Sequence, residues 1–205
     1  MNARHIGFFI IVQSMVFFLY GCSTTPGDAA NRGSHHDAAA DLYRQGVENN
    51  DSLAAFKLGM LIHNGKVSPN KYGSAGSWFN RGCELGDLTS CHNAGVGYEY
   101  GQHGLVQSYE QARFHYQKAA EHSYTQSQYN LGSLYANQHF SNDIEGLKWL
   151  LISQSQARKC IRQPLCKWIL EDPPGHMPSL ISRMTLEDIQ AAKMLAKKWE
   201  SESGQ

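Results

Sequence analysis

The chain has 205 residues, of which 41% are hydrophobic and 18% are charged, with 18 basic and 18 acidic side chains. This composition suits one folded domain with a sizeable core, and it excludes a chain that is disordered throughout. The net charge of zero also argues against nucleic acid as the main partner, because phosphate binding requires a basic surface.

The N-terminal segment, residues 1–21, is predicted to be a signal peptide. Arg4 provides a short basic start, and residues 6–20 are apolar apart from Gln13 and Ser14. As a helix, residues 6–20 would extend about 22 Å, which is shorter than the roughly 30 Å hydrocarbon core of a membrane. The segment is therefore predicted to be an export signal and not a membrane span.

The signal ends in a sequence that resembles the lipobox of bacterial lipoproteins. Leu19-Tyr20-Gly21-Cys22 matches that motif except at its second position, where a small residue is usual. The resemblance implies that Cys22 is lipidated and becomes the mature N-terminus; the alternative is an ordinary cleaved signal peptide with an incidental cysteine. Ser23, in place of aspartate, implies sorting to the outer membrane, facing the periplasm. Residues 22–36 are polar and are predicted to form a flexible tether.

Four cysteines remain if Cys22 carries lipid, namely Cys83, Cys91, Cys160 and Cys166. In an oxidising compartment four cysteines can pair in three ways, and proximity in the sequence favours Cys83–Cys91 and Cys160–Cys166. A zinc site is the alternative, but neither pair has CxxC spacing and no pair of histidines flanks them. Disulfides are therefore predicted, with no metal site and no cofactor.

An internal repeat organises the middle of the chain. Glycine recurs at Gly59, Gly95 and Gly132, after 36 and then 37 residues. Farther along the chain from each glycine, a small residue is followed three and four positions later by a pair of bulky side chains. The three bulky pairs are Trp78-Phe79, His115-Tyr116 and Trp149-Leu150. Offsets of three and four share one helix face, so each unit is predicted to have two helices, with the bulky pairs in the core. Because a glycine inside a helix costs about 1 kcal/mol relative to alanine, its recurrence predicts a close approach between helices.

These motifs resemble Sel-one-like repeats, which are related to tetratricopeptide repeats. The resemblance covers roughly residues 37–156, and in its best copy His115 stands where tryptophan is usual. It implies an all-α fold, an α-solenoid of about three two-helix repeats in which stacked neighbours make a continuous core. Residues 39–47 match the end of a second helix, so the array is predicted to begin with half a repeat. The alternative is three unrelated amphipathic hairpins.

The resemblance also gives a place to the first cysteine pair. Cys83 would end one helix and Cys91 would open the next, which is similar to the within-repeat disulfides of cysteine-rich repeat proteins in bacterial envelopes. Closing so short a loop should stabilise the fold by about 2–3 kcal/mol on the chain-entropy model.

Residues 157–205 are predicted to cap the C-terminal end of the array. Pro164 should stop or kink a helix, and residues 172–176 are expected to form a loop. Thr185 followed by Asp188 is typical of a helix N-terminus and predicts a last helix that ends near Ser201.

In the tetratricopeptide geometry the first helix of each unit lines the concave face, and this predicts where a partner binds. Positions three before each repeat glycine, and those at the ends of the first helices, supply aromatic, carboxamide and polar side chains to this face. The predicted groove residues are Phe56, His63, Asn64, His92, Glu99, Tyr100, Tyr129 and Asn137. Such side chains suit an extended peptide, because they offer contact area and hydrogen bonds at low entropic cost. The alternative is that Phe56 and Tyr129 pack between helices.

The predicted function is a non-enzymatic adaptor or scaffold that binds a protein or peptide in the bacterial cell envelope and contacts the membrane through its lipid anchor. No catalytic residue is assigned, since GxSxG, HExxH, P-loop and dinucleotide-binding motifs do not occur. The alternative is an enzyme acting on β-lactam or peptidoglycan-like substrates, suggested by the association of cysteine-rich repeat proteins with penicillin binding. Ser68-Pro69-Asn70-Lys71 has the S-x-x-K spacing of such enzymes, but their S-D-N and K-T-G motifs are missing.

Overall fold

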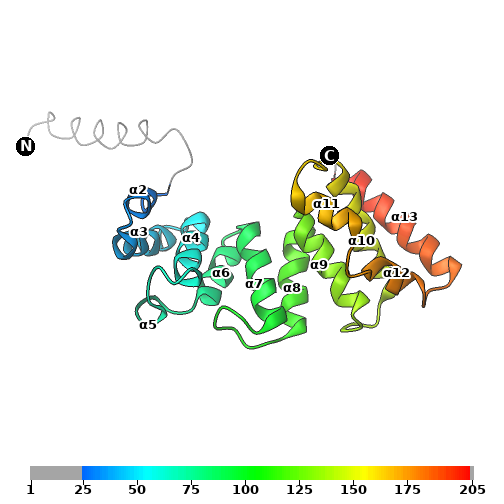
Figure 1. Ribbon diagram of the computed structural model, residues 1–205, viewed down its shortest axis with the longest axis horizontal. Helices are drawn as coiled ribbons and strands as arrows, with labels where there is room; N and C mark the ends of the chain where they lie inside the picture. Colours follow the sequence, from blue (N-terminus) through cyan, green and yellow to red (C-terminus); the bar gives the residue numbers. More distant parts are fainter. Residues whose placement is uncertain (1–24, 204–205) are drawn as a thin grey trace, which may run out of the picture.

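The computed structural model of the chain describes residues 25–203, and within that range it contains helices and no strand. The helices follow one another along the long axis of the molecule, from α2 at one end to α13 at the other (Figure 1). The predicted all-α solenoid is confirmed. The predicted signal peptide, residues 1–21, and the predicted lipidation site Cys22 lie outside the described residues. Within residues 25–203 no helix is long and apolar enough to cross a bilayer.

Three helix pairs form the array, and the two members of each pair pack against each other. The pairs are α4 (Ser52–His63) with α6 (Ala75–Glu84), α7 (Leu88–Tyr100) with α8 (Tyr109–Ala120), and α9 (Thr125–Ala136) with α10 (Asp143–Arg158). The preceding helix, α3 (His36–Glu48), packs on α4 as the predicted half repeat. A short helix, α5 (Pro69–Tyr72), lies in the first connecting loop, where the sequence predicts only a turn.

Side-chain caps explain where most of these helices begin. An oxygen of the residue before the helix accepts a hydrogen bond from a backbone N–H in the first turn, which satisfies one of the donors that the helix leaves free. The capping residues are Asp51 for α4, Ser74 for α6, Asp87 for α7, Ser108 for α8 and Asn142 for α10. The last helix, α13 (Leu186–Ser203), begins with the predicted signal: Asp188 N donates to Thr185 Oγ1, and Thr185 N donates to Asp188 Oδ2.

The recurring glycines let the two helices of each pair approach closely. A Cβ atom on Gly95 of α7 would lie 2.5 Å from Cδ1 of Tyr116 in α8, closer than real Cβ contacts. The corresponding contacts in the other pairs are Gly59 with Phe79 at 2.6 Å and Gly132 with Leu150 at 2.7 Å. In each pair the partner is the second member of the bulky pair, and it is fully buried. The predicted close approach is confirmed.

Replacing Gly95 with alanine should therefore destabilise the array by about 1–3 kcal/mol, because the methyl group overpacks a buried ring that cannot move aside. This loss should appear although alanine is favoured by about 1 kcal/mol in a helix. Urea unfolding measures the effect. Gly97→Ala in the same helix is the matched control, since its nearest neighbour is a methyl group of Leu105, a flexible side chain. Equal or greater loss in the control would remove the argument for close approach at Gly95.

The prediction that every bulky pair belongs to the core is wrong for one residue. Trp78 is only half-buried, whereas its neighbour Phe79 is fully buried. The Trp78 indole Nε1 donates a hydrogen bond of 2.7 Å to the carbonyl oxygen of Tyr72. The ring therefore joins α5 to α6 at the edge of the core.

Residues 22–36 are predicted to form a flexible tether, but the structure differs from this prediction from Thr25 onward. This stretch contains α2 (Asp28–Arg32), which packs against α3. The Asp28 carboxylate accepts hydrogen bonds from Lys57 Nζ of α4 at 2.7 Å and from the Tyr43 hydroxyl of α3 at 2.8 Å. Burial acts to raise the pKa of Asp28, but these hydrogen bonds hold the pKa below its usual value. The segment joins the fold because Asp28 is paired with a lysine far away in the sequence.

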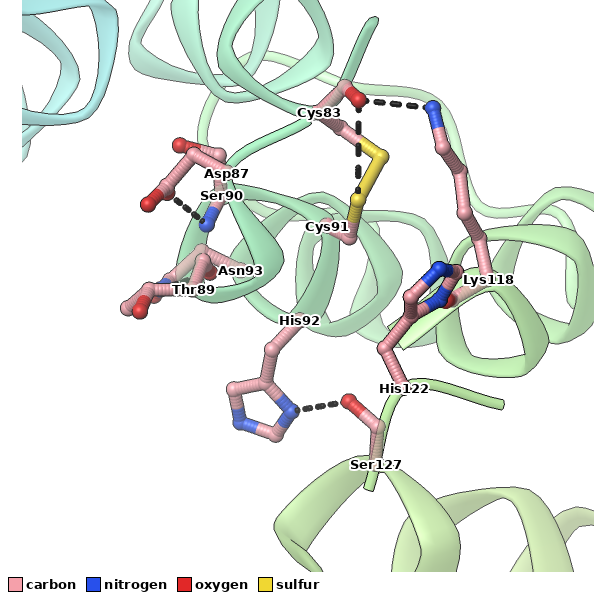
Figure 2. Close-up of a disulfide and its surroundings, with 10 residues drawn as sticks. All are labelled: Cys83, Asp87, Thr89, Ser90, Cys91, His92, Asn93, Lys118, His122 and Ser127. Carbon is pink, nitrogen blue, oxygen red and sulfur yellow. Dashed lines mark hydrogen bonds between the residues drawn. A yellow bond between two sulfur atoms is a disulfide. The ribbon is translucent and has the colours of Figure 1, made fainter. Parts of the chain in front are cut away.

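Both predicted disulfides are present. Cys83–Cys91 joins the end of α6 to the start of α7 with a Cα–Cα distance of 4.5 Å, and Lys118 Nζ of α8 donates to the Cys83 carbonyl oxygen at 2.7 Å (Figure 2). Cys160–Cys166, with a Cα–Cα distance of 5.8 Å, spans the break between α10 and α11 (Pro164–Glu171). The first disulfide therefore fixes a turn between repeats, and the second fixes the start of the cap.

The cap packs on the last repeat. Pro164 opens α11 at its first turn, where its missing N–H costs nothing, as the sequence predicts for a helix break. The final helix α13 packs along α10, as Figure 1 shows at the C-terminal end of the array. A further short helix, α12 (His176–Ile181), packs on α9 and α10. It begins at the last residue of the predicted loop, and no sequence pattern predicts it.

Candidate functional site

The first helices α4, α7 and α9 carry three equivalent candidates, and their side chains differ in burial. Phe56 is half-buried and its ring centroid lies 6.2 Å from that of Phe79, so it packs between helices. His92 is half-buried, and Tyr129 is only 3% exposed. The structure brings His92 and Tyr129 together at one pocket and leaves Phe56 away from it.

His92 lies where α7 meets α9. Its Nδ1 is 3.0 Å from Ser127 Oγ, a hydrogen bond whose donor depends on the imidazole tautomer (Figure 2). Its ring centroid lies 5.7 Å from that of Tyr116 and 5.3 Å from that of Tyr124. Burial lowers the pKa of His92 to about 4, so the imidazole is neutral at pH 7.

Tyr129 ties α9 to the cap. Its hydroxyl donates a hydrogen bond of 2.7 Å to Asp172 Oδ1 at the end of α11, and Asp172 Oδ2 accepts a second one from Met177 N at 2.8 Å. Burial and the Asp172 carboxylate raise the pKa of Tyr129. The Tyr129 ring also contacts Trp168 of α11 edge to face, with ring centroids 5.0 Å apart. These contacts hold α11 beside the first helices.

The resulting pocket lies between α7, α9 and α11 and has a volume of about 150 Å³. Its lining residues are His92, Gln126, Tyr129, Asn130, Leu165, Trp168 and Ile169. Leu165 and Trp168 are exposed at its edge. With His92 neutral, the described residues that line the pocket present aromatic, aliphatic and carboxamide groups and no charge at pH 7.

The remaining predicted residues lie toward the C-terminal ends of the first helices. His63, Asn64, Tyr100 and Asn137 are exposed. Tyr100, the last residue of α7, lies eight residues beyond His92, and Asn137, directly after α9, lies eight residues beyond Tyr129. Eight residues correspond to about 12 Å along a helix, so both lie about two turns beyond the pocket.

Glu99 differs from these exposed residues because its side chain is buried. Its Oε2 accepts a hydrogen bond of 2.7 Å from the Tyr116 hydroxyl, and burial raises the pKa of the carboxyl group. It is held inside the second repeat and presents no surface to a partner.

Sequence reasoning missed five pocket residues, and it could have found two of them. On α9, Gln126 lies three positions before Tyr129 and four positions before Asn130, so helical spacing suggests that Gln126 adjoins both of them. The other three belong to α11. Its position depends on the bond between Asp172 and Tyr129, which no local pattern reveals.

The S-x-x-K sequence does not assemble a catalytic pair in the structure. Ser68 caps α5, and its Oγ accepts a hydrogen bond from Asn70 N at 3.3 Å. Lys71 Nζ points to α3, where it lies 3.2 Å from the Asp37 carboxylate. The spacing therefore reflects a capped turn.

Paired helices in a row, with a pocket on the face of the first helices, define a helical-repeat solenoid with a candidate binding groove. The profile of the Sel1 repeat matches residues 52–87, 89–124 and 125–153, which correspond to the three helix pairs. The chain belongs to the Sel1 repeat proteins. A search of curated proteins finds no match to it.

Two solved structures share the fold. One is a protective antigen present in uropathogenic Escherichia coli strains that displays an SLR fold; it is 19% identical, with a TM-score of 0.62, and the match covers 80% of this chain and 32% of the antigen. The other is a Sel1 repeat protein from Oxalobacter formigenes, 22% identical, with a TM-score of 0.52, and the match covers 78% of this chain and 63% of that protein. The chain thus spans about a third of the length of the first relative and under two thirds of the second.

Proposed function

We propose that the protein is a non-enzymatic adaptor of the bacterial cell envelope, anchored by lipid at Cys22, that binds an extended peptide segment in the groove between α7, α9 and α11. The Sel1 repeat family consists generally of protein–protein interaction scaffolds, which supports the general class. The observation that carries the groove assignment is the pocket in which His92 and Tyr129 meet the exposed side chains of α11.

The chemistry of the pocket indicates what kind of segment it binds. Its volume of about 150 Å³ suits one apolar side chain, which would pack against Leu165 and Trp168. Gln126 and Asn130 at the same site have carboxamides that can pair with a peptide backbone, whose N–H and C=O groups need partners when they are buried. The proposed ligand is therefore a neutral, extended segment with an apolar anchor residue.

The anchor would hold the array close to the membrane. Only Ser23 and Thr24 separate Cys22 from Thr25. Thr25 is held to the fold, because its Oγ1 accepts a hydrogen bond of 3.0 Å from Lys57 Nζ. Even a fully extended chain would place the lipid within about 10 Å of Thr25. In this proposal the first repeat lies next to the membrane, and the groove, in the second and third repeats, lies farther along the array.

A photocrosslinking residue placed at Trp168 in living cells tests the groove. We expect it to capture one protein, and we expect that capture to be lost when Leu165→Glu places a charge in the pocket. Met194 on α13 is exposed and does not line the pocket, so a crosslinker there is the matched control. Equal capture from both positions, or capture that survives Leu165→Glu in a folded protein, would contradict the groove assignment.

The anchor is tested separately, by mass spectrometry of the mature N-terminus and by membrane partition. The wild type should carry lipid on Cys22 and sediment with membranes, and Cys22→Ala should lose both properties. A Cys22→Ala protein that still partitions with membranes would exclude lipidation as the anchor and leave the groove assignment unaffected.

A further inference from the structure

A second candidate site appears when the three repeats are compared at one position. Trp78, His115 and Trp149 occupy the same place in the second helices. Both indoles donate to protein oxygens at 2.7 Å: Trp78 Nε1 to the Tyr72 carbonyl and Trp149 Nε1 to Glu145 Oε1. His115 is 7% exposed, and its Nδ1 has no hydrogen-bond partner among the described residues. The middle repeat therefore has a smaller ring and an unpaired polar atom where its neighbours have a satisfied tryptophan.

A pocket of about 330 Å³ opens at this position, between α6, α7 and α8. Its lining residues are Asn80, Cys83, Glu84, Tyr98, Gln111, Phe114, His115 and Lys118. None of these residues lines the groove pocket between α7, α9 and α11. The volume is at the lower end of the range for small-ligand sites, about 300–1,000 Å³. It suits a compact group and not a large cofactor.

Two of the residues that line the pocket carry a buried polar atom without a hydrogen-bond partner among the described residues. Besides His115 Nδ1, the buried Asn80 Oδ1 has no partner among the described residues, while Asn80 Nδ2 donates to the Tyr98 hydroxyl at 3.0 Å. Burying a polar atom without a partner costs about 1–3 kcal/mol, so two such atoms at one site favour a ligand that pairs with both.

The walls of the pocket are aromatic. The Tyr98 ring stacks on His115 with a centroid distance of 5.3 Å and an interplanar angle of 16°. Phe114 meets the same imidazole edge to face at 5.2 Å and is itself 60% exposed. Flat aromatic surfaces pack well against a planar group, and the exposed Phe114 ring provides contact area at the entrance.

The charged residues of the pocket are already engaged. Lys118 Nζ donates to the Cys83 carbonyl oxygen at 2.7 Å, and Glu84 pairs with Arg81 at 3.0 Å. Burial lowers the pKa of His115 to about 4, with the Lys118 charge acting in the same direction, so the imidazole is neutral at pH 7. A cationic ligand is disfavoured, because Glu84 is already paired with Arg81 and Lys118 keeps its positive charge beside a neutral carbonyl. The two unpaired atoms, Asn80 Oδ1 and His115 Nδ1, are uncharged and favour a neutral ligand.

We propose that this pocket binds the carboxamide of an asparagine or glutamine side chain from a partner protein, as a second interaction site on the middle repeat. A carboxamide is planar and neutral and has both N–H donors and a carbonyl acceptor. It can donate to Asn80 Oδ1 and can pair with His115 Nδ1 in either tautomer of the imidazole. A sugar fits less well, because most of its hydroxyl groups would be left unpaired between Tyr98 and Phe114.

The experiment titrates the purified protein with N-acetylglutamine methylamide, which presents the carboxamide on a blocked residue. Binding is followed through the ¹⁵N and ¹H resonances of the His115 imidazole and the Asn80 side-chain amide. N-acetylleucine methylamide serves as the control for apolar contact alone, and N-acetylglucosamine serves as the sugar. His115→Trp is the matched variant, since it reproduces the residue found at this place in the other two repeats.

We expect saturable shifts at His115 and Asn80 with the glutamine probe in the millimolar range, little or no shift with leucine or the sugar, and loss of binding in His115→Trp. That variant should melt at the same temperature as the wild type or higher, so the loss cannot be attributed to unfolding. Should it fail to fold, His115→Phe removes the ring nitrogens in a ring of similar size.

Four results would overturn the proposal. The absence of saturable shifts in the wild type would mean that the two buried atoms are not open to a ligand in the folded protein. Equal shifts with the leucine probe would show that the pocket does not recognise the carboxamide specifically. Shifts that persist in a folded His115→Trp protein would show the same. Tighter binding of N-acetylglucosamine would assign the pocket to a glycan instead. None of these results bears on the groove between α7, α9 and α11.

Discussion

Replacing Trp149 with alanine should destabilise the protein by about 3–5 kcal/mol, the range for a buried aromatic residue cut to a methyl group. Trp149 is 3% exposed, and its ring meets Trp199 of α13 edge to face with centroids 5.9 Å apart. Its indole Nε1 donates to Glu145 Oε1 at 2.7 Å. The substitution therefore removes core packing, a hydrogen bond and the contact that holds the capping helix. Urea unfolding of the purified domain measures the loss.

Tyr100→Ala is the control for this prediction, because it also removes a large aromatic ring but from a side chain that is 60% exposed. Its effect on the free energy of unfolding should stay below about 0.5 kcal/mol. Trp78→Ala should fall between the two, since Trp78 is half-buried and has one hydrogen bond. If Tyr100→Ala were as destabilising as Trp149→Ala, the surface position of Tyr100 would be incorrect and it would belong to the core.

The repeat could be predicted from the sequence because its physical cause is local. Gly95 and Tyr116 belong to adjacent helices joined by a short loop, so their contact recurs in each unit and leaves a periodic trace in the sequence. The Cys83–Cys91 disulfide was predictable for the same reason, as it closes a single turn between neighbouring helices. The part of the groove made by His92 and Tyr129 was also predictable, because these residues occupy equivalent positions in successive repeats.

The rest of the groove could not be predicted, because it depends on contacts between distant residues. Asp172 binds Tyr129 across 43 positions and thereby places α11 beside α9. Lys57 binds Asp28 across 29 positions and turns the predicted tether into part of the fold. Neither pair consists of two positions that recur from repeat to repeat, so no sequence pattern indicates that these residues contact each other. The Asp28–Lys57 pair therefore determines where the fold begins, and the Asp172–Tyr129 pair places α11 at the groove.

The pH dependence of stability offers a second large effect, and it arises from buried neutral histidines. Burial lowers the pKa of His92 and of His115 to about 4, against about 6.5 in an unfolded chain. Between pH 6.5 and pH 4 the unfolded chain therefore binds protons that the folded protein excludes. Stability is full above pH 6.5, falls as the pH decreases, and reaches its lower limit below pH 4.

The contribution of His115 can be isolated with His115→Trp, which has no titrating group at that place. At pH 5 the wild type should have lost about 2 kcal/mol relative to pH 7 on account of His115 alone, so the stability advantage of the variant should grow by that amount. The nearby charges on Lys118 and Glu84 act on the His115 pKa in opposite directions, and burial outweighs both. Glu99, whose pKa burial raises, titrates in the opposite sense but is present in both proteins and cancels in the difference. Urea unfolding of both proteins at pH 7, 6 and 5 measures this difference, and parallel stability curves would mean that the folded protein accepts a proton on His115 as readily as the unfolded chain does.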